Sequence, residues 1–216
     1  MADAVNATEP VVVWGIGTSR TLRVHWLAHE LGLDYEVRPV GARTGETQTP
    51  EYLAMSAKGK VPVLNHGSLV LTESPAILSY LNEVFADNSK VFVPDNARER
   101  AQLSEWCFYV MTELDAHPLY IMRRHEALSD IYGEAPEVVQ SAREYFYRLI
   151  TFADARITEA TPYLFGERLS IADILLTTTL GWAERYGLDL SDALLGYLRR
   201  ATKRPAFKSA NTMNYA

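Results

Sequence analysis

The chain has 216 residues, of which 48% are hydrophobic and 22% charged, and its formal net charge is -6. This composition is typical of a folded globular protein, and the length predicts one medium domain plus a small one rather than a disordered chain. The acidic balance, with an isoelectric point near 5.4, argues against nucleic acid or an anionic membrane as a partner, because both require a basic face.

The first half of the chain predicts alternating strands and helices. Apolar runs bounded by glycine and proline indicate strands, and apolar residues that recur every three or four positions indicate helices. The expected elements are a strand at 11–16, a helix ending at Gly32, a strand at 34–40, helical turns at 50–57, strands at 61–65 and 68–72 and a helix from Pro75. This order, β-α-β-α-β-β-α, predicts an open sheet with helices packed on it.

The second half of the chain predicts helices alone. An apolar stripe beginning at Leu103 is expected to stop or kink near Pro118, because proline interrupts a helix. Ser170 and Asp173 form a capping box at the start of another helix, which assigns Asp173 a structural role. Further helices are expected at 136–160, 191–203 and 205–210.

These elements predict a small α/β domain followed by an all-helical one. The expected boundaries are a flexible tail at 1–9, the α/β domain at 10–86, a polar linker at 87–97 and the helical domain at 98–216. The single cysteine, Cys107, fits a reducing compartment. No signal peptide is recognisable, and no apolar stretch approaches the ~20 residues of a membrane span, so we expect a cytoplasmic protein.

Two hydroxyl side chains, Thr18 and Ser19, follow the first strand and open the first helix. The run from Gly15 to Arg20 is similar to a dinucleotide-binding fingerprint, and Glu36 stands about twenty residues further on. Arg20, however, replaces the third glycine and would crowd the helix–strand contact, which argues against a nucleotide. A hydroxyl at a helix N-terminus can instead donate to a thiolate; the alternative is a simple helix cap.

Glu73, Ser74 and Pro75 stand where the last strand passes into a helix. A residue before proline avoids the α region, so we expect Ser74 as the N-cap and Pro75 as the first helical residue. The first amides of this helix can stabilise a carboxylate, and Glu73 can pair with an ammonium, as at the end of an amino acid or γ-glutamyl group. The alternative is an ordinary cap beside a solvated glutamate.

Lys60, Val61 and Pro62 open the third strand. A proline at this place can be cis, which would turn the amide and carbonyl of Val61 outward to pair with an extended peptide; the alternative is a trans proline. His25 and His29 stand four residues apart without a third ligand or the glutamate of a zinc-protease motif. We therefore expect both histidines to face solvent and to bind no metal, and we expect Cys107 to pack on the apolar side of its helix.

Four stretches, taken together, resemble the glutathione transferase superfamily, in particular its bacterial theta- or beta-like cytosolic members. They are TSRTLRVHWLAHELGLDYE at 18–36, GKVPVL at 59–64, LTESPAILSYL at 71–81 and LSIADILL at 169–176. The resemblance extends from residue 10 to residue 208 and implies an α/β thioredoxin-like N-terminal domain plus an all-α helical C-terminal domain. It also implies a homodimer, with the N-terminal domain of one chain against the helical domain of the other.

By this resemblance the chain is a glutathione S-transferase, which uses glutathione as co-substrate and needs no metal or redox cofactor. Ser19 would activate the thiol, whereas zeta- and beta-like alignments select Thr18. Val61, before a cis-Pro62, would pair with the cysteinyl backbone of glutathione. The remaining contacts implied are Glu73 and Ser74 to the γ-glutamyl end, and Lys60 and, more weakly, Gln48 to the glycyl end.

The helical domain would supply the pocket for a hydrophobic electrophile. The candidate residues are Trp106, Tyr109, Val110, Tyr120 and Arg123, half or more of which we also expect in the core. Conjugation, as in detoxification, is the default reaction, but the same site suits a peroxidase, lyase, isomerase or dehalogenase. A non-catalytic binding or regulatory scaffold is the main alternative, and the presence of Lys60, Glu73 and Ser74 argues against it.

Two stretches depart from the family pattern. Theta-like members often carry a His-Lys pair where this chain has Thr47-Gln48, and a common Asn-Pro before the Gly-Lys-Val-Pro run is replaced within Ser56-Ala57-Lys58. Neither change removes the expected glutathione site, but both make the assignment to one class of the superfamily less specific.

Overall fold

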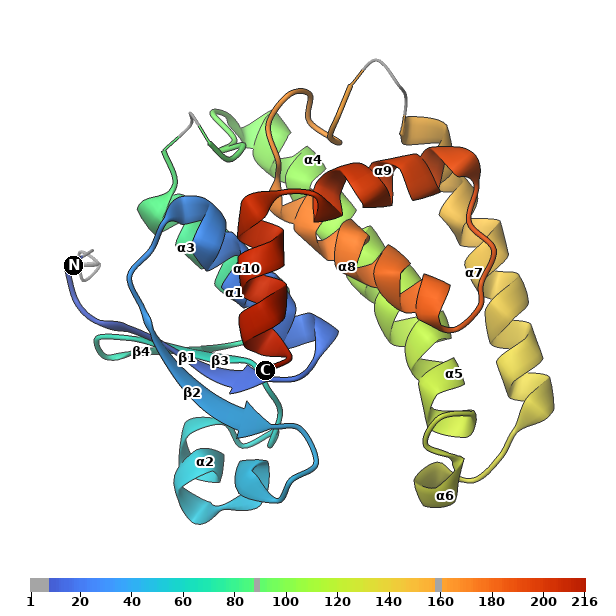
Figure 1. The fold of residues 1–216 in the computed structure, drawn as a ribbon, viewed down its shortest axis with the longest axis horizontal. Coiled ribbons are helices and arrows are strands. Elements are labelled where there is room, and N and C mark those ends of the chain that lie inside the picture. The colour runs from blue at the N-terminus through green and yellow to red at the C-terminus, as the bar shows by residue number, and fades with distance from the viewer. Residues whose placement is uncertain (1–7, 88–89, 158–160) are drawn as a thin grey trace. The chain divides into compact units, whose positions relative to one another are not determined.

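The computed structural model describes residues 8–87, 90–157 and 161–216 and divides the chain into two compact units (Figure 1). The first unit comprises the chain up to Val93 together with Thr202–Ala216, and the second is Pro94–Ala201. The predicted tail falls mostly on residues 1–7, which lie outside the described residues. An α/β unit and a helical unit are present, so the predicted fold class is confirmed.

The first unit contains one four-stranded sheet in the order β2-β1-β3-β4. The strands are β1 (Val11–Ile16), β2 (Glu36–Gly41), β3 (Val63–His66) and β4 (Leu69–Thr72). β1 runs parallel to β2 and antiparallel to β3, and β3 and β4 form an antiparallel hairpin. The predicted order of elements is therefore confirmed, although β3, expected at 61–65, covers Val63–His66.

Two helices, α1 (Ser19–Leu31) and α3 (Ser74–Phe85), lie on one side of this sheet, and α2 (Pro50–Met55) lies on the other, after a 3-10 turn η1 (Glu46–Gln48) (Figure 1). The apolar faces predicted from the helical period are buried: Val24, Leu27, Ile77 and Leu81 are 0% exposed. Burial of such side chains contributes roughly 1.5–3 kcal/mol each, which is why the apolar pattern alone predicts this packing.

The C-terminal helix α10 (Pro205–Asn214) packs against α1 and belongs to the first unit. The rings of Phe207 and Trp26 meet edge to face at 4.9 Å, and Arg204 pairs with Glu30, Nε to Oε1, at 2.6 Å. The predicted helical domain, 98–216, therefore includes a helix that belongs to the first unit. Aromatic packing and a charged pair bind this last helix to α1.

The predicted linker at 87–97 is only partly a linker. Residues 88–89 lie outside the described residues, but Val91 is 0% and Phe92 7% exposed. Asn82 Nδ2 also donates to the Phe92 carbonyl at 3.2 Å. The apolar side chains after Lys90 therefore anchor this segment to the first unit, and the boundary falls at 93–94.

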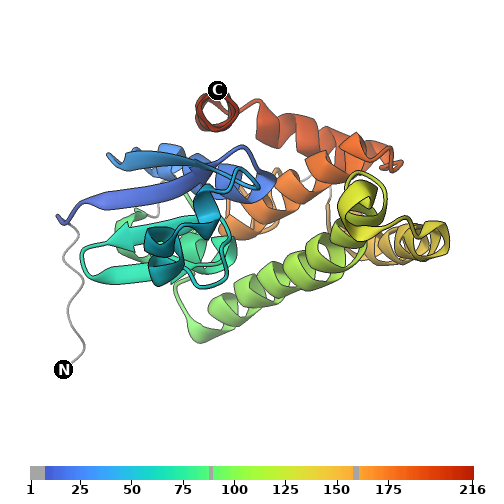
Figure 2. The same ribbon diagram turned by 90° about the horizontal axis from the view of Figure 1, so that it is seen from below.

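The second unit begins with one continuous helical rod, drawn in green in Figure 2. It consists of α4 (Ala97–Phe108), a π-helical stretch η2 (Tyr109–Leu119) and α5 (Tyr120–His125). The helix was expected to stop or kink near Pro118, yet the rod continues through this residue. Proline breaks the ordinary i→i−4 hydrogen bonding, and here the wider π-helical turns accommodate the interruption without ending the helix.

The rest of the second unit is also helical. The helices are α6 (Ser129–Tyr132), α7 (Pro136–Arg156), α8 (Ile171–Arg185) and α9 (Asp192–Thr202). The prediction for α7 extended to residue 160, but the helix ends at Arg156, and residues 158–160 lie outside the described residues. Within the described ranges, no helix combines the length and the apolar character that a membrane crossing requires.

The capping box at the start of α8 is confirmed. The carboxylate of Asp173 accepts hydrogen bonds from Ser170 N at 2.8 Å and from Ser170 Oγ at 2.6 Å. It also accepts from Leu164 N at 2.9 Å and from Tyr197 Oη at 2.6 Å. The fully buried Asp173 thus joins the loop before α8, the first turn of α8 and helix α9, which is a structural role.

Candidate functional site

Three of the predicted site segments meet at one end of the sheet. In the strand register, Trp14 pairs with Val63, and Val63 pairs with Thr72. The residues that follow β1, precede β3 and follow β4 therefore lie at the same end of the sheet. The backbone of Gly15 lies close to Val61, because a Cβ on Gly15 would be 2.6 Å from Val61 Cβ. Gly15 also has φ +117°, so both the available space and the backbone conformation require glycine there.

Thr18 caps helix α1. Its Oγ1 accepts a hydrogen bond from Thr21 N at 3.0 Å, while Thr18 N donates to Thr21 Oγ1 at 3.0 Å. This reciprocal pair is a capping box made of two threonines. The Thr18 hydroxyl is therefore engaged in the cap, the role that the sequence left open as the alternative to thiol activation.

Ser19 is the first residue of α1 and is partly exposed. It lies directly after the cap, at the helix end whose partial positive charge stabilises an anion. Thr18 accepts in the cap and keeps its hydroxyl hydrogen, so both hydroxyls stand at this helix end, and the choice between Ser19 and Thr18 for the ligand sulfur stays a prediction.

The peptide bond between Val61 and Pro62 is cis, as the sequence analysis considered. Pro62 is buried and Val61 partly exposed, at the start of β3. Tyr52 Oη from α2 donates to the Lys60 carbonyl at 2.8 Å, which fixes the backbone immediately before this bond. The Lys60 side chain itself is exposed.

Helix α3 begins one residue earlier than expected. Ser74, predicted as the N-cap, is the first helical residue, and the N-cap is Glu73, which makes no side-chain capping hydrogen bond. Glu73 has φ +73° and ψ +114°, a conformation that non-glycine residues rarely adopt. Backbone outliers of this kind often mark ligand sites, since they cost about 1–3 kcal/mol and require support from the surrounding structure.

Ser74 is only 2% exposed and lies against a buried arginine. Arg23, on α1 and 0% exposed, has Nη1 3.4 Å from Ser74 Oγ, a long hydrogen bond in which the hydroxyl oxygen accepts. The hydroxyl hydrogen can then donate to a ligand. A guanidinium, a hydroxyl and the N-terminal end of α3 together make this corner attractive to a carboxylate.

Glu73 is exposed and already paired within the protein. Lys58 Nζ lies 2.5 Å from Glu73 Oε1, with side chains 51% and 65% exposed. An ion pair this exposed contributes little to stability, with a median near 0–1 kcal/mol. A ligand ammonium can therefore compete with Lys58 or bind beside it.

Gln48 lies next to the same loop. Its Nε2 donates to Thr47 Oγ1 at 3.2 Å, and a Cβ added to Gly59 would lie 2.6 Å from that nitrogen. The exposed side chains of Gln48 and Lys60 thus belong to neighbouring segments. This proximity is consistent with the predicted pair of contacts to a glycyl carboxylate.

The electrophile-pocket candidates lie in the second unit. Trp106 and Tyr109 pack with Phe152 of α7, with ring centroids 5.1 and 5.0 Å from Phe152, and Tyr109 Oη donates to the Leu149 carbonyl. Trp106 is 5% and Val110 0% exposed, so these residues contribute to the core, as expected for part of the set.

The other two pocket candidates are only half-buried. Tyr120 and Arg123 lie on α5, and the Arg123 guanidinium stands 6.0 Å from the ring centroid of Trp182 on α8. Tyr120 and Arg123, together with the half-buried Tyr109, are therefore the members of the predicted set with surface left to contact a substrate.

The prediction that His25 faces solvent is wrong. His25 is 0% exposed, with Nε2 2.9 Å from the Gly15 carbonyl and Nδ1 3.0 Å from Tyr35 Oη. Burial lowers its pKa, so it serves as a neutral hydrogen-bonding group that holds the loop after β1. Within the described part of the chain, no three His, Cys, Asp or Glu side chains gather as metal ligands. Cys107 is buried, and burial raises its pKa to about 12.

Four residues around the site were missed by the sequence analysis: Thr21, Arg23, Lys58 and Asn214. Thr21 stands three positions after Thr18, the capping-box spacing, so a search that admitted threonine at both places would have found it. Lys58 lies in a stretch that departs from the family pattern, so the resemblance assigns it no role. No local pattern indicates Arg23 or Asn214, because both act through contacts with distant parts of the chain.

The comparisons with known proteins agree with this geometry. Residues 9–83 match the family described as Glutathione S-transferase, N-terminal domain, and residues 136–207 match Glutathione S-transferase, C-terminal domain. Glutathione S-transferase F14 of Arabidopsis thaliana is 32% identical over 181 residues, covering 81% of this chain and 67% of the relative.

Two solved structures are also similar. A glutathione-S-transferase from Xylella fastidiosa is 27% identical, with a TM-score of 0.79 over 94% of this chain and 98% of that one. A theta class glutathione S-transferase from Xanthomonas axonopodis pv. citri, solved with glutathione bound, is 25% identical, with a TM-score of 0.79 over 97% and 100%. The chain belongs to the glutathione S-transferase family.

Proposed function

We propose that this protein is a glutathione S-transferase that binds glutathione at the sheet end and uses its thiolate as a nucleophile. The observation that carries the proposal is the meeting, at one end of the sheet, of the start of α1, the Val61-Pro62 bond and the start of α3. These segments offer in turn an anion-stabilising helix end, an extended backbone edge and a carboxylate-binding corner. Family membership supports the same assignment.

In the proposed complex, each part of glutathione has a partner. The γ-glutamyl carboxylate binds Ser74 and the first amides of α3, and its ammonium binds Glu73. The cysteinyl amide and carbonyl pair with the backbone of Val61. The glycyl carboxylate binds Lys60 and Gln48, whose segments lie side by side.

Bound glutathione loses its thiol proton to solvent, and Ser19 Oγ donates a hydrogen bond to the resulting thiolate. The sulfur attacks an electrophilic carbon, a carbon–sulfur bond forms, and the leaving group departs with its electron pair. The gain in rate comes from stabilising the thiolate and from holding the two reactants together. Tyr120 and Arg123 are the proposed contacts to the electrophile.

A change of Ser74 to alanine tests the carboxylate corner. Removing the hydroxyl leaves the ligand carboxylate short of one donor, which costs about 1–3 kcal/mol at a charged hydrogen bond, or roughly a 5- to 150-fold rise in Kd. Isothermal titration calorimetry with glutathione measures this. Ser79→Ala, on the exposed side of α3, is the matched control and should bind like wild type.

If the protein is instead a non-catalytic scaffold, glutathione binding or conjugation should be absent. If the wild-type protein fails to bind millimolar glutathione, the transferase assignment is wrong and the fold serves another purpose. If it binds glutathione but conjugates none of a broad panel of aryl halides, epoxides and unsaturated carbonyls, the proposal reduces to a binding protein.

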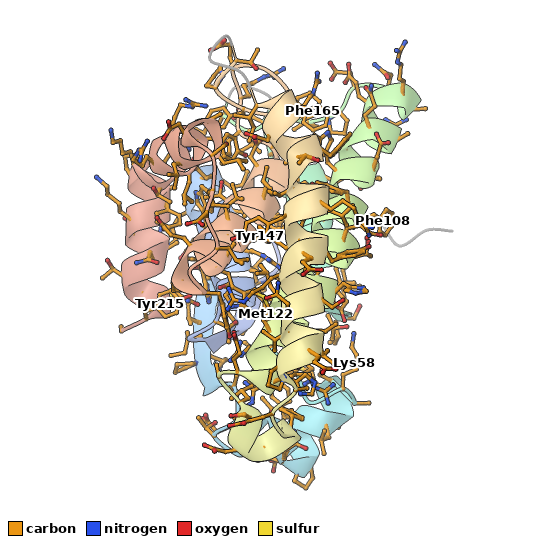
Figure 3. All side chains as sticks on the ribbon, turned by 90° about the vertical axis from the view of Figure 1, so that its right-hand side faces the viewer. Lys58, Phe108, Met122, Tyr147, Phe165 and Tyr215 are labelled. Carbon is orange, nitrogen blue, oxygen red and sulfur yellow. The ribbon has the colours of Figure 1, made fainter. Side chains whose placement is uncertain are left out.

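A homodimer is the proposed assembly, with two exposed aromatic side chains of the helical unit, Phe108 and Phe152, as its contact residues. Phe108, on α4, is 69% exposed and labelled in Figure 3, and Phe152, on α7, is 50% exposed. Phe152 continues the Trp106–Tyr109 cluster to the surface. Val70, 42% exposed on the edge strand β4, is the proposed counterpart from the other chain.

We expect Phe108→Glu to convert the dimer into a monomer, because a charge in an apolar interface loses its hydration without gaining a partner. Size-exclusion chromatography with light scattering reports the mass directly. Ile131→Glu, on a different helix (α6) and 61% exposed, is the control and should remain dimeric. A dimer that survives Phe108→Glu and Phe152→Glu together would place the interface elsewhere.

A further inference from the structure

The C-terminal residue of helix α10 is joined to the loop that opens α1. Asn214 is 0% exposed. Its Oδ1 accepts from Thr21 Oγ1 at 2.7 Å, its Nδ2 donates to the Thr18 carbonyl at 3.2 Å, and its own carbonyl accepts from Gly17 N at 2.8 Å. One residue therefore holds three points of the segment 17–21, which carries both candidate hydroxyls.

The hydrogen bonds around Thr21 form one consistent set. Thr21 Oγ1 lies near Asn214 Oδ1, the Thr18 carbonyl at 2.8 Å and Thr18 N at 3.0 Å. A hydroxyl has a single hydrogen. If Thr21 donates it to Asn214 Oδ1, its oxygen accepts from Thr18 N, while the Thr18 carbonyl accepts from Leu22 N at 3.0 Å and from Asn214 Nδ2. Asn214 thus supplies the acceptor for the Thr21 hydroxyl and a second donor to the Thr18 carbonyl.

The helix that carries Asn214 is independently fastened to α1. Arg204 donates to both carboxylate oxygens of Glu30, at 2.6 and 2.7 Å, and Phe207 packs edge to face on Trp26. Both contacts lie nearer the other end of α10, within the first unit. The position of Asn214 relative to α1 is therefore set by more than its own hydrogen bonds.

Gly17 is exposed at φ +80°, and no heavy atom lies within 4 Å of where its Cβ would stand. Its amide is held by the Asn214 carbonyl. Ser19 follows within two residues, so a shift of the Gly17–Thr18 backbone moves the Ser19 hydroxyl directly.

We propose that Asn214 is a positioning residue for the transferase reaction: through Gly17, Thr18 and Thr21 it places the Ser19 hydroxyl against the glutathione sulfur. This inference rests on the proposed function. It makes the last helix of the chain part of the thiol site, although Asn214 itself touches neither substrate. Since misplacement of about 1 Å can cost up to ~10²-fold in rate, such a role has a measurable effect.

The test compares four variants by steady-state kinetics over a range of pH. Asn214→Ala removes the side-chain contacts, and Thr21→Val removes the linking hydroxyl while keeping the volume. For both we expect kcat to fall about 10-fold and the acid limb of the pH–rate profile to move to higher pH, with little change in KM for glutathione. Thr21→Ser restores the hydroxyl and should behave like wild type.

Asn96→Ala is the control for a purely structural effect, since it removes the side-chain cap of α4 in the second unit and leaves every contact of α10 in place. It should lower the melting temperature and leave kcat and the pH profile unchanged. If Asn214→Ala and Thr21→Val lower the melting temperature but keep the wild-type kcat and pH profile, the positioning role is wrong. Glutathione titration of the wild type separates the two proposals: without binding, the proposed function itself fails, whereas binding with unaltered variants overturns only the role of Asn214.

Discussion

Replacing Ser19 by alanine should lower kcat for glutathione conjugation about 10²-fold, the loss found when one preorganised donor to a developing anion is removed. The affinity for glutathione should stay close to that of the wild type, because the γ-glutamyl and glycyl ends keep their partners. The thiolate absorbance of the bound complex at neutral pH should fall, and the acid limb of the pH–rate profile should move to higher pH. Stopped-flow mixing and ultraviolet difference spectra measure both.

Two further variants, Thr18→Val and Ser19→Thr, distinguish which of the two hydroxyls contacts the thiol. Thr18→Val removes the capping hydroxyl, so its main effect should be a loss of about 1 kcal/mol in the free energy of unfolding. Ser19→Thr keeps a hydroxyl and should recover most of the rate. The reverse pattern, with a large rate loss in Thr18→Val and a small one in Ser19→Ala, would assign the thiol contact to Thr18.

Replacing Asp173 by asparagine should lower the free energy of unfolding by about 3 kcal/mol or more. The carboxylate accepts four hydrogen bonds in a buried site, from Ser170 N and Oγ, Leu164 N and Tyr197 Oη. An asparagine presents an NH₂ group to some of these donors and leaves them unpaired. Burial raises the pKa of Asp173, and the four hydrogen bonds act in the opposite direction.

Urea unfolding followed by far-ultraviolet circular dichroism measures the loss. Asp192→Asn, an exposed acidic residue in the first turn of α9, is the control and should change stability by no more than about 0.5 kcal/mol. An Asp173→Asn protein that unfolds at the wild-type urea concentration would show that the carboxylate is not needed for the fold.

Much of the architecture could be predicted because its signals are local. The apolar period of α1 and α3, the glycines after β1 and the Ser170–Asp173 box are each contained within a few residues. Such patterns specify which segments are helices or strands and which faces are buried. The family resemblance, carried by four short motifs, then indicated the site residues of the first unit.

The prediction for Ser74 shows where local reasoning fails by a small margin. The preference of a residue before proline for extended backbone indicated Ser74 as the cap, but the structure places the cap at Glu73 with a positive φ. The turn from β4 into α3 imposes this conformation, and no propensity of glutamate predicts it. His25 was misjudged for a similar reason, since its burial depends on Gly15 and Tyr35 outside its own helix.

The sequence by itself determined the two-part fold, the family and the residues that line the end of the sheet, because helical period, caps and turn residues act over short stretches of chain. Only the tertiary structure decided that α10 belongs with the first unit, that Thr18 and Thr21 form the capping box of α1 and that Asn214 holds the loop beside Ser19. The Thr21–Asn214 hydrogen bond joins residues 193 positions apart. A contact across such a separation arises from tertiary packing, and no periodic pattern in the sequence indicates it.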